Sequence, residues 1–259
     1  MSKIARYRIA NEIHYGLMEE GKGFMRLSGS PFDSLATSGI VDSLEHARLL
    51  CPLDKPRVFG VGFNYAAHAK ETGQALPTRA ATFMKPDSAA IGPDEAIIYP
   101  VEGQRVDFEC ELAVIIGRGG RRIAREDVDQ HIFGFTCAND VSERPIQFDE
   151  MAAGCLLIGK GFDTFCPLGP VIATGLNHRQ LAIATRLNGE VKQSSNTADL
   201  VFDVAHLVSY ISQAITLRPG DVIITGTPEG IGPMRPGDVV EVEIEGIGVL
   251  RNPVVAESR

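Results

Sequence analysis

Short segments in which apolar and polar side chains alternate dominate the chain, and this pattern predicts β-strands more often than helices. Near the N-terminus the alternating segments are RYRIA, IHYGLM and GFMRL, separated by Asn11-Glu12 and by Gly21-Lys22-Gly23. Short polar or glycine-rich breaks between such segments are typical of a meander of antiparallel strands. We therefore expect a small N-terminal β unit over residues 1–50, with a boundary near Cys51-Pro52, where a loop begins.

The remaining residues, 51–259, carry short β-branched runs bounded by glycine or proline: VFGVG, AVIIG, PVIAT, VIIT and VVEVEIE. The close spacing of these runs favours a mainly β, mixed α+β architecture over regularly alternating strands and helices. Two segments predict helices. Residues 64–73 offer Asn64 as an N-cap and Gly73 just past the end, and residues 201–215 repeat apolar side chains at helical spacing.

Composition and charge exclude several classes of function. The 259-residue chain has 33 acidic and 25 basic side chains, a formal net charge of −8. Nucleic-acid binding usually requires a basic surface, so this balance argues against a nucleic-acid partner. The N-terminal segment lacks the apolar core of a signal peptide, and no run reaches the length of a membrane span. Five cysteines without a CxxC pair fit free thiols, so we expect a cytoplasmic protein with no membrane partner.

One predicted strand, VDFECEL at residues 106–112, places three carboxylates on one face. Alternation puts Asp107, Glu109 and Glu111 together, spaced by about 7 Å, where like charges repel unless water or a cation compensates them. Such a row suits a hard cation, Mg²⁺, Mn²⁺ or Ca²⁺, better than Zn²⁺. The segment VEVEIE at residues 240–245 makes a similar row, however, and a sheet with one solvated face explains either.

Two further features have both a chemical and an ordinary explanation. His68 and Glu71 stand at i and i+3 of a predicted helix, where a carboxylate can orient an imidazole as a general base. The alternative is an exposed helix with an incidental His–Glu pair. Lys160 lies in the glycine-rich segment IGKGFD, and the alternative for it is a solvated loop lysine.

Seven segments, taken in order, resemble the fumarylacetoacetate hydrolase family over roughly residues 56–254. They are GFNYAAHAKETG at 62–73, FMKPDSAAIGP at 83–93, DFECEL at 107–112, ANDVS at 138–142, GKGFDTFCPLGP at 159–170, LNGEVKQSSNT at 187–197 and ITGTPEGIG at 224–232. The resemblance implies the family's C-terminal-type mixed β-sandwich roll, behind the small N-terminal β unit. It also implies a homodimer.

The resemblance separates the two acidic rows and implies roles for individual residues. The divalent cation, Mg²⁺ or Mn²⁺ in preference to Ca²⁺, is expected on Glu109, Glu111 and Asp140, with Asp107 supporting them, whereas Glu241, Glu243 and Glu245 are expected to be structural. The remaining expected site residues are His68, Glu71 and Lys160 for catalysis, and Arg144, Gln147, Lys85 and Thr227 for substrate binding.

The implied substrates are small 2-oxo acids of the kind found in aromatic catabolism. One reading is hydrolytic C–C cleavage of a 2,4-dioxo acid, of the acylpyruvate or fumarylpyruvate type, by water that His68 and Glu71 activate. A second is an isomerase or decarboxylase of a hydroxymuconate-like or oxaloacetate-like acid on the same metal site. A third, from a different class, is a non-catalytic β module whose acidic rows only keep it soluble.

The chain departs from the family pattern beside the expected substrate. Pro145 stands where relatives carry an acid, Gly161 follows the lysine where serine is common, and the chain has no tryptophan where relatives often have Gln-Trp. These changes bear on which substrate is recognised more than on the metal ligands.

Overall fold

The computed structural model describes residues 1–19 and 21–258, and its strands confirm the mainly β class. The largest sheet runs in the order β4 (Thr37–Asp42), β3 (Gly23–Leu27), β2 (Glu12–Glu19), β1 (Ser2–Ile9), β14 (Cys166–Thr174), β12 (Ile132–Asn139), β11 (Cys110–Ile116), β17 (Val222–Ile224), β6 (Val58–Gly62) and β7 (Ala81–Lys85), with β5 (Ala47–Leu49) beside β1 and β8 (Ala90–Ile91) beside β14. A second sheet contains β13 (Ser142–Glu143), β10 (Val106–Phe108) and β18 (Gly232–Met234). The third contains β16 (Glu190–Asn196), β15 (Ala182–Leu187), β19 (Val239–Ile244), β20 (Gly248–Ala256) and β9 (Ile97–Tyr99).

Helices are few and short, as the sequence predicts. The α-helices are α1 (Ala66–Glu71), α2 (Arg144–Ala152), α3 (Ile158–Gly161) and α4 (Val204–Ala214). Short 3-10 helices occupy Leu44–His46, Asp87–Ala89, Arg125–Gln130, His178–Gln180 and Thr197–Asp199. None of the helices in the described ranges is long and apolar enough to cross a membrane.

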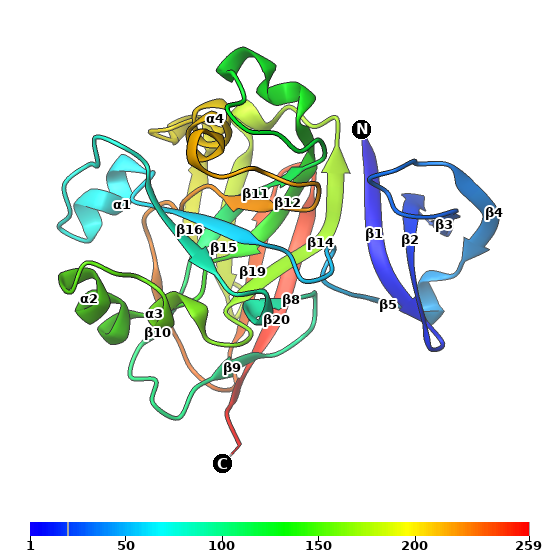
Figure 1. Ribbon diagram of the computed structural model, residues 1–259. Coiled ribbons are helices and arrows are strands. Elements are labelled where there is room, and N and C mark those ends of the chain that lie inside the picture. The colour runs from blue at the N-terminus through cyan, green and yellow to red at the C-terminus, as the bar shows by residue number, and fades with distance from the viewer. Residues whose placement is uncertain (20, 259) are drawn as a thin grey trace.

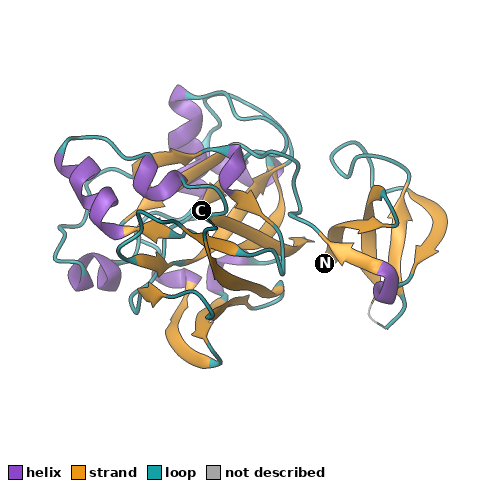
Figure 2. Ribbon diagram, turned by 90° about the horizontal axis from the view of Figure 1, so that it is seen from below, coloured by secondary structure: helices purple, strands orange, loops and turns teal. Residues whose placement is uncertain are grey.

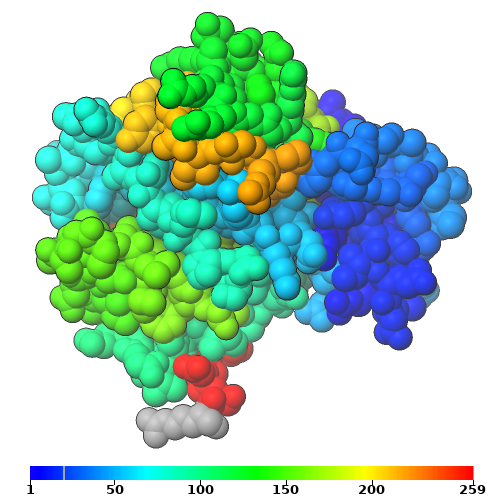
Figure 3. Space-filling view, in the orientation of Figure 1, coloured from blue at the N-terminus to red at the C-terminus, as the bar shows by residue number. Residues whose placement is uncertain are grey.

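The first 50 residues form a meander that lies beside the rest of the molecule (Figures 1 and 2). In the space-filling view they make the lobe on the right, coloured dark to mid blue, which lies against the rest of the molecule (Figure 3). Strand β1 nevertheless pairs with β14, so the meander extends the large sheet. The lobe is held by a buried polar cluster: Arg26 donates two hydrogen bonds to Asp42, and the Tyr7 hydroxyl donates a third at 2.6 Å.

Strand β11 lies in the middle of the large sheet, between β12 and β17, and all seven of its residues are buried. Its alternate side chains enter two different apolar clusters: Leu112 and Val114 pack in one, and Ala113 and Ile115 in the other. A strand covered on both faces needs apolar residues at every position, which explains the uninterrupted run LAVII.

The predicted continuous strand over residues 106–112 is wrong at one position. The chain leaves the second sheet after β10 and enters the large sheet at β11, so Glu109 belongs to neither strand. Its backbone N–H donates to the Asn139 side chain at 2.9 Å, and its carbonyl accepts from the Asp140 N–H at 2.8 Å. The acidic row therefore spans a junction between two sheets.

The two predicted helices form with altered N-termini. Helix α4 is capped by Asp203, whose side chain accepts the His206 N–H. The prediction that Asn64 caps α1 is wrong, since Tyr65 is the N-cap residue and makes no side-chain cap bond. The Asn64 side chain instead makes hydrogen bonds with the backbones of Phe202 and Thr225. These residues are distant in sequence, so a local sequence pattern cannot show the bonds.

Replacing Asp42 tests the polar cluster of the N-terminal lobe. Asp42→Asn leaves the buried ends of Arg26 and Tyr7 without their charged acceptor, so we expect a loss of about 2 kcal/mol in the free energy of unfolding and faster amide exchange in β1–β3. Urea unfolding followed by circular dichroism, with hydrogen–deuterium exchange, measures both. The Arg26 hydrogen bonds, against the effect of burial, lower the pKa of Asp42.

The stabilisation by Asp42 is thus complete above the ordinary carboxyl pKa and is lost as the pH falls through the lowered one, so the difference between wild type and variant should shrink in acid. Asp54→Asn is the control, because the Asp54 side chain pairs with Arg6 but is 74% exposed. Its effect should stay within about 0.5 kcal/mol. Equal losses in the two variants would contradict the prediction.

Candidate active site

A cavity of about 190 Å³ opens where β6, β7 and the β10–β11 junction meet α1, α2 and α3. In Figure 1 these three helices lie together on one side of the molecule, away from the N-terminal meander. The floor of the cavity is charged, whereas its walls include apolar side chains such as Phe63, Phe83 and Phe148. A cavity with a charged floor and apolar walls suits a small polar molecule with a short carbon chain.

Three carboxylates converge at the floor of the cavity. Glu109, Glu111 and Asp140 each offer an oxygen within 4.8 Å of the others, and all three side chains are buried. The pairing of β11 with β12 brings them together, because Cys110 stands opposite Asn139 and the residues that flank this pair are Glu109, Glu111 and Asp140. Two segments that are 30 residues apart in sequence thus make one acidic cluster.

Cations from two short helices form ion pairs with these carboxylates. Arg144, at the start of α2, donates to Asp107 at 2.9 Å and to Glu109 at 2.5 Å. Lys160, in α3, bridges Glu109 at 2.7 Å and Asp140 at 2.6 Å. Burial acts to raise the pKa of Glu109, but the charges of Arg144 and Lys160 outweigh it and hold that pKa well below the ordinary value.

Glu111 is different, because no lysine or arginine in the described part of the chain forms an ion pair with it. Its carboxylate accepts the Gly226 backbone N–H at 2.6 Å. Burial, with the neighbouring Asp140 and Glu109, raises the pKa of Glu111 well above its usual value. A divalent cation at the triad would supply the missing positive charge, and three carboxylate oxygens are the ligands that Mg²⁺ and Mn²⁺ prefer.

The second acidic row lacks this geometry. Along β19, buried residues alternate with half-buried ones, so one face is solvated. Glu243 pairs with Arg186, and Glu245 accepts the Ala182 backbone N–H. Within residues 1–19 and 21–258, the only cluster of three potential metal ligands is the one formed by Glu109, Glu111 and Asp140.

His68 and Glu71 form the pair that their spacing on a helix predicts. The His68 side chain is 6% exposed and lines the cavity, with Nδ1 at 3.3 Å from the Glu71 carboxylate. The second oxygen of Glu71 accepts the Gly230 N–H at 3.0 Å. Because Nδ1 faces Glu71, Nε2 is the ring nitrogen left to exchange a proton in the cavity.

The loop that follows β17 connects the histidine pair to the acidic triad. Gly226 and Gly230 both have positive φ angles, and a Cβ at either would lie within 2.7 Å of another residue. Only glycine lets their N–H groups reach Glu111 and Glu71. Between them Thr227 lines the cavity, and its hydroxyl accepts a hydrogen bond from Gln193 at 2.8 Å.

Helix α3 has one turn, so Lys160 depends on its neighbours for its position. The Glu150 carboxylate accepts the backbone N–H groups of residues 157–159, at 2.7 to 3.1 Å. The Lys160 ammonium also lies 5.3 Å from the centre of the Phe83 ring. Opposite Phe83 in the sheet stands Gly60, where any side chain would collide with that ring.

The cavity brings together most of the residues that the sequence singles out. Its lining includes the triad together with His68, Arg144, Gln147, Lys160 and Thr227. Lys85 does not line it, because the Lys85 side chain is completely buried, where its ammonium pairs with Asp140 and donates to the Val141 carbonyl at 3.1 Å. The individual roles expected for these residues stay predictions.

Several supporting residues escape sequence reasoning. Gln193 lies in the 187–197 segment that resembles the family, but nothing in that segment shows that it holds Thr227. Phe83 opens the 83–93 segment that resembles the family and Glu150 lies outside all seven segments, but no local pattern shows their contacts with Lys160 and α3, which are tertiary. Pro145 falls in the first turn of α2, a position that proline favours, and so fits the structure.

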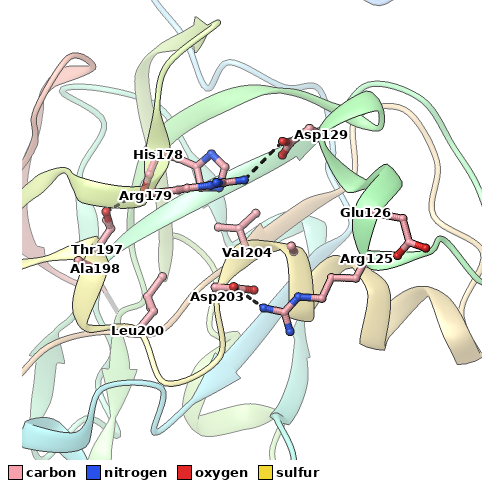
Figure 4. Close-up of a pocket in the computed structure, with 11 residues that line it drawn as sticks. Arg125, Glu126, Asp129, His178, Arg179, Thr197, Ala198, Leu200, Asp203 and Val204 are labelled. Atoms are coloured by element: carbon pink, nitrogen blue, oxygen red, sulfur yellow. Dashed lines mark hydrogen bonds and ion pairs between the residues drawn. The ribbon is translucent and has the colours of Figure 1, made fainter.

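A larger cleft, of about 600 Å³, lies between the 3-10 turns and the start of α4 and shares no lining residue with the first cavity. Figure 4 shows its charged side chains facing one another in pairs. Arg125 pairs with Asp203 at 2.5 Å, and Arg179 with Asp129 at 3.7 Å. These pairs are exposed to solvent, whereas the buried cluster of potential metal ligands lies in the smaller cavity, so the smaller cavity is the better candidate for chemistry.

Comparison with known proteins places the chain among enzymes of one family. Residues 57–255 match the family model described as fumarylacetoacetate (FAA) hydrolase C-terminal, and residues 2–52 match the one described as Rv2993c-like, N-terminal. The chain is 45% identical over 233 residues to the mitochondrial oxaloacetate tautomerase FAHD2A of Bos taurus, covering 86% of this chain and 74% of the relative.

Two solved structures share the fold at high identity. The 5-carboxymethyl-2-hydroxymuconate delta-isomerase of Mycobacterium smegmatis superposes with a TM-score of 0.91 at 39% identity, covering 98% of this chain and all of the other. The fumarylpyruvate hydrolase of Pseudomonas aeruginosa, in complex with Mn²⁺ and pyruvate, gives a TM-score of 0.75 at 36% identity, covering 81% and 92%. With its acidic triad, its histidine pair and these matches, the chain belongs to the fumarylacetoacetate hydrolase family.

Proposed function

We propose that the protein is a divalent-metal-dependent enzyme that moves a proton on a small 2-oxo acid, as a keto–enol tautomerase or double-bond isomerase. One observation carries this proposal: the buried triad and the His68–Glu71 pair line or adjoin the same cavity. The environment of Glu111 supports a cation there, because burial and the neighbouring carboxylates raise its pKa and no lysine or arginine among the described residues forms an ion pair with it. Mg²⁺ and Mn²⁺ are the proposed ions.

The cation, when bound, supplies Lewis-acid chemistry: it attracts the oxygens of a 2-oxo acid and offsets the negative charge that develops on them. The protein supplies the proton transfer. His68 Nε2 takes a proton from the carbon next to the oxo group, while Glu71 holds the imidazole and stabilises its charged form. His68 then returns the proton at a different atom of the substrate. Arg144 and Lys160 line the cavity, and a cation on the triad would leave more of their charge to act on an anionic substrate.

Hydrolysis of a 2,4-dioxo acid is the second candidate. The same His68–Glu71 pair can deprotonate water, and the Pseudomonas relative is a fumarylpyruvate hydrolase. Proton transfer ranks first because the oxaloacetate tautomerase, at 45% identity, and the hydroxymuconate isomerase, at 39%, match this chain at higher identity than the fumarylpyruvate hydrolase, at 36%. Both reactions begin with a base beside a polarised 2-oxo acid. The homodimer and the cytoplasmic location expected from the sequence stay predictions.

Titration with Mn²⁺ tests the metal site directly. Wild-type protein should bind one ion per chain, measured by electron paramagnetic resonance of the free ion, and Glu111→Gln should weaken binding at least about 100-fold, because it removes a ligand. Glu243→Gln is the matched control, since it removes a carboxylate from the other row. Unchanged affinity in Glu111→Gln, or equal losses in both variants, would show that the triad is not the site.

A substrate panel separates the two reactions. We expect the Mn²⁺-loaded protein to interconvert the enol and keto forms of oxaloacetate or of a hydroxymuconate-type diacid, followed by ultraviolet absorbance. If hydrolysis is the reaction instead, acetylpyruvate or fumarylpyruvate will yield pyruvate, measured with a coupled dehydrogenase. Protein that is loaded with metal but inactive on all four compounds would refute both candidates.

Replacing His68 tests the proton transfer on whichever compound reacts best. His68→Gln should lower kcat by roughly 10²- to 10⁴-fold, the usual contribution of a general base, and Glu71→Gln by less. His46→Gln, at an exposed histidine of the N-terminal lobe, should leave kcat unchanged. Steady-state kinetics at saturating Mn²⁺ measure these effects, and full activity of His68→Gln would rule out its role as the base.

A further inference from the structure

Phe63 has a backbone conformation that bulky side chains avoid. Its φ angle is 55°, in the left-handed region, at the point where β6 turns towards α1. Glycine adopts this region freely and asparagine tolerates it, whereas an aromatic residue is strained there. Strain of this kind persists when the surrounding structure fixes the backbone, and it is concentrated at functional sites.

The turn at Phe63 is fixed by the next residue and not by the Phe63 ring. Asn64 is fully buried and makes three hydrogen bonds: its amide donates to the Phe202 and Thr225 carbonyls, and its oxygen accepts the Phe202 N–H at 2.7 Å. Gly226 packs closely against the Asn64 side chain. These contacts set the path of the backbone. Glycine or asparagine at position 63 would therefore allow the same turn with less strain.

The Phe63 ring lies instead against the histidine of the active site. It lines the cavity, half-buried, and stacks on the His68 imidazole with 6.2 Å between ring centres and 17° between planes. Glu71 holds the same imidazole at its Nδ1 edge. The two neighbours act in different directions: a hydrogen bond fixes the rotation of the ring in its plane, and a flat face limits its tilt.

We propose that Phe63 is a positioning residue for His68, and that its strained conformation is retained because it places an aromatic face against the imidazole. This inference rests on the proposed function, in which His68 transfers the proton. Phe63 keeps Nε2 at one angle to the substrate, while Glu71 sets which nitrogen faces it. A base held in this way needs no reorganisation before it reacts.

Four variants at position 63, with a control elsewhere, test the proposal. Phe63→Asn relieves the strain and removes the ring, Phe63→Leu removes the ring only, and Phe63→Tyr and Phe63→Trp keep an aromatic face. The control is Arg122→Asn, because Arg122 has the same φ of 55° and is exposed, outside the cavity. Both asparagine variants should melt at the wild-type temperature or above, since each removes a strained conformation.

The kinetic readout separates positioning from folding. Phe63→Asn and Phe63→Leu should lower kcat about 10-fold with little change in KM, because a misplaced base slows the reaction without weakening binding. Phe63→Tyr or Phe63→Trp should restore at least half of kcat, and Arg122→Asn should match the wild type. Wild-type kcat in a correctly folded Phe63→Asn would overturn the proposal, as would a loss in the ring-retaining variants equal to that in Phe63→Leu.

A second readout does not depend on turnover. In the wild type the stacked phenyl ring should shift the His68 imidazole proton resonances, assigned by their absence in His68→Gln. That shift should disappear in Phe63→Asn and persist in Phe63→Tyr, and a shift that is unchanged in Phe63→Asn would overturn the positioning role. A wild type that is inactive on every substrate would refute the proposed function, while the resonances would still report whether Phe63 positions His68.

Discussion

The burial of four carboxylates at a junction between two sheets is the constraint that the active site must satisfy. Asp107, Glu109, Glu111 and Asp140 are all almost inaccessible to water. An unpaired buried charge is too costly to keep, so each carboxylate requires a cation or strong donors close by. Because Glu111 has no lysine or arginine partner among the described residues, the folded protein retains a place where a divalent cation is electrostatically favourable.

This constraint explains why the elements around the cavity are short and tightly braced. Each cation comes from a different segment: Arg144 from the first turn of α2, Lys160 from the single turn of α3, and Lys85 from the edge strand β7. Short elements have little stability of their own, and they need tertiary support. Glu150 gives it to α3 by accepting three backbone N–H groups. Tertiary hydrogen bonds and ion pairs, more than long helices or strands, thus hold the residues around the site in position.

Local patterns in the sequence predict those strands, helices and side-chain pairs that depend on residues close together in the chain. The alternation of β19, the helical repeat of α4 and the His68–Glu71 spacing all form in the structure as expected. Contacts across long sequence separations decide the rest. The interruption at Glu109 depends on Asn139, and the loss of Asn64 as a helix cap depends on residues almost 140 positions away. The resemblance to a family finds the three carboxylates that converge in the structure, but not the residues that hold them in place.

The loop between Gly226 and Gly230 has a thermodynamic consequence. Its first N–H binds Glu111 of the triad, and its last binds Glu71 behind His68, while Gln193 holds the middle. A movement of this loop alters both hydrogen bonds together, so the charge state of the triad and the orientation of the imidazole are energetically linked. Such linkage is reciprocal: the coupling free energy by which the state of Glu111 affects the His68–Glu71 pair equals the one by which that pair affects Glu111. One short loop therefore joins the acidic and the histidine side of the cavity, although these come from distant segments of the chain.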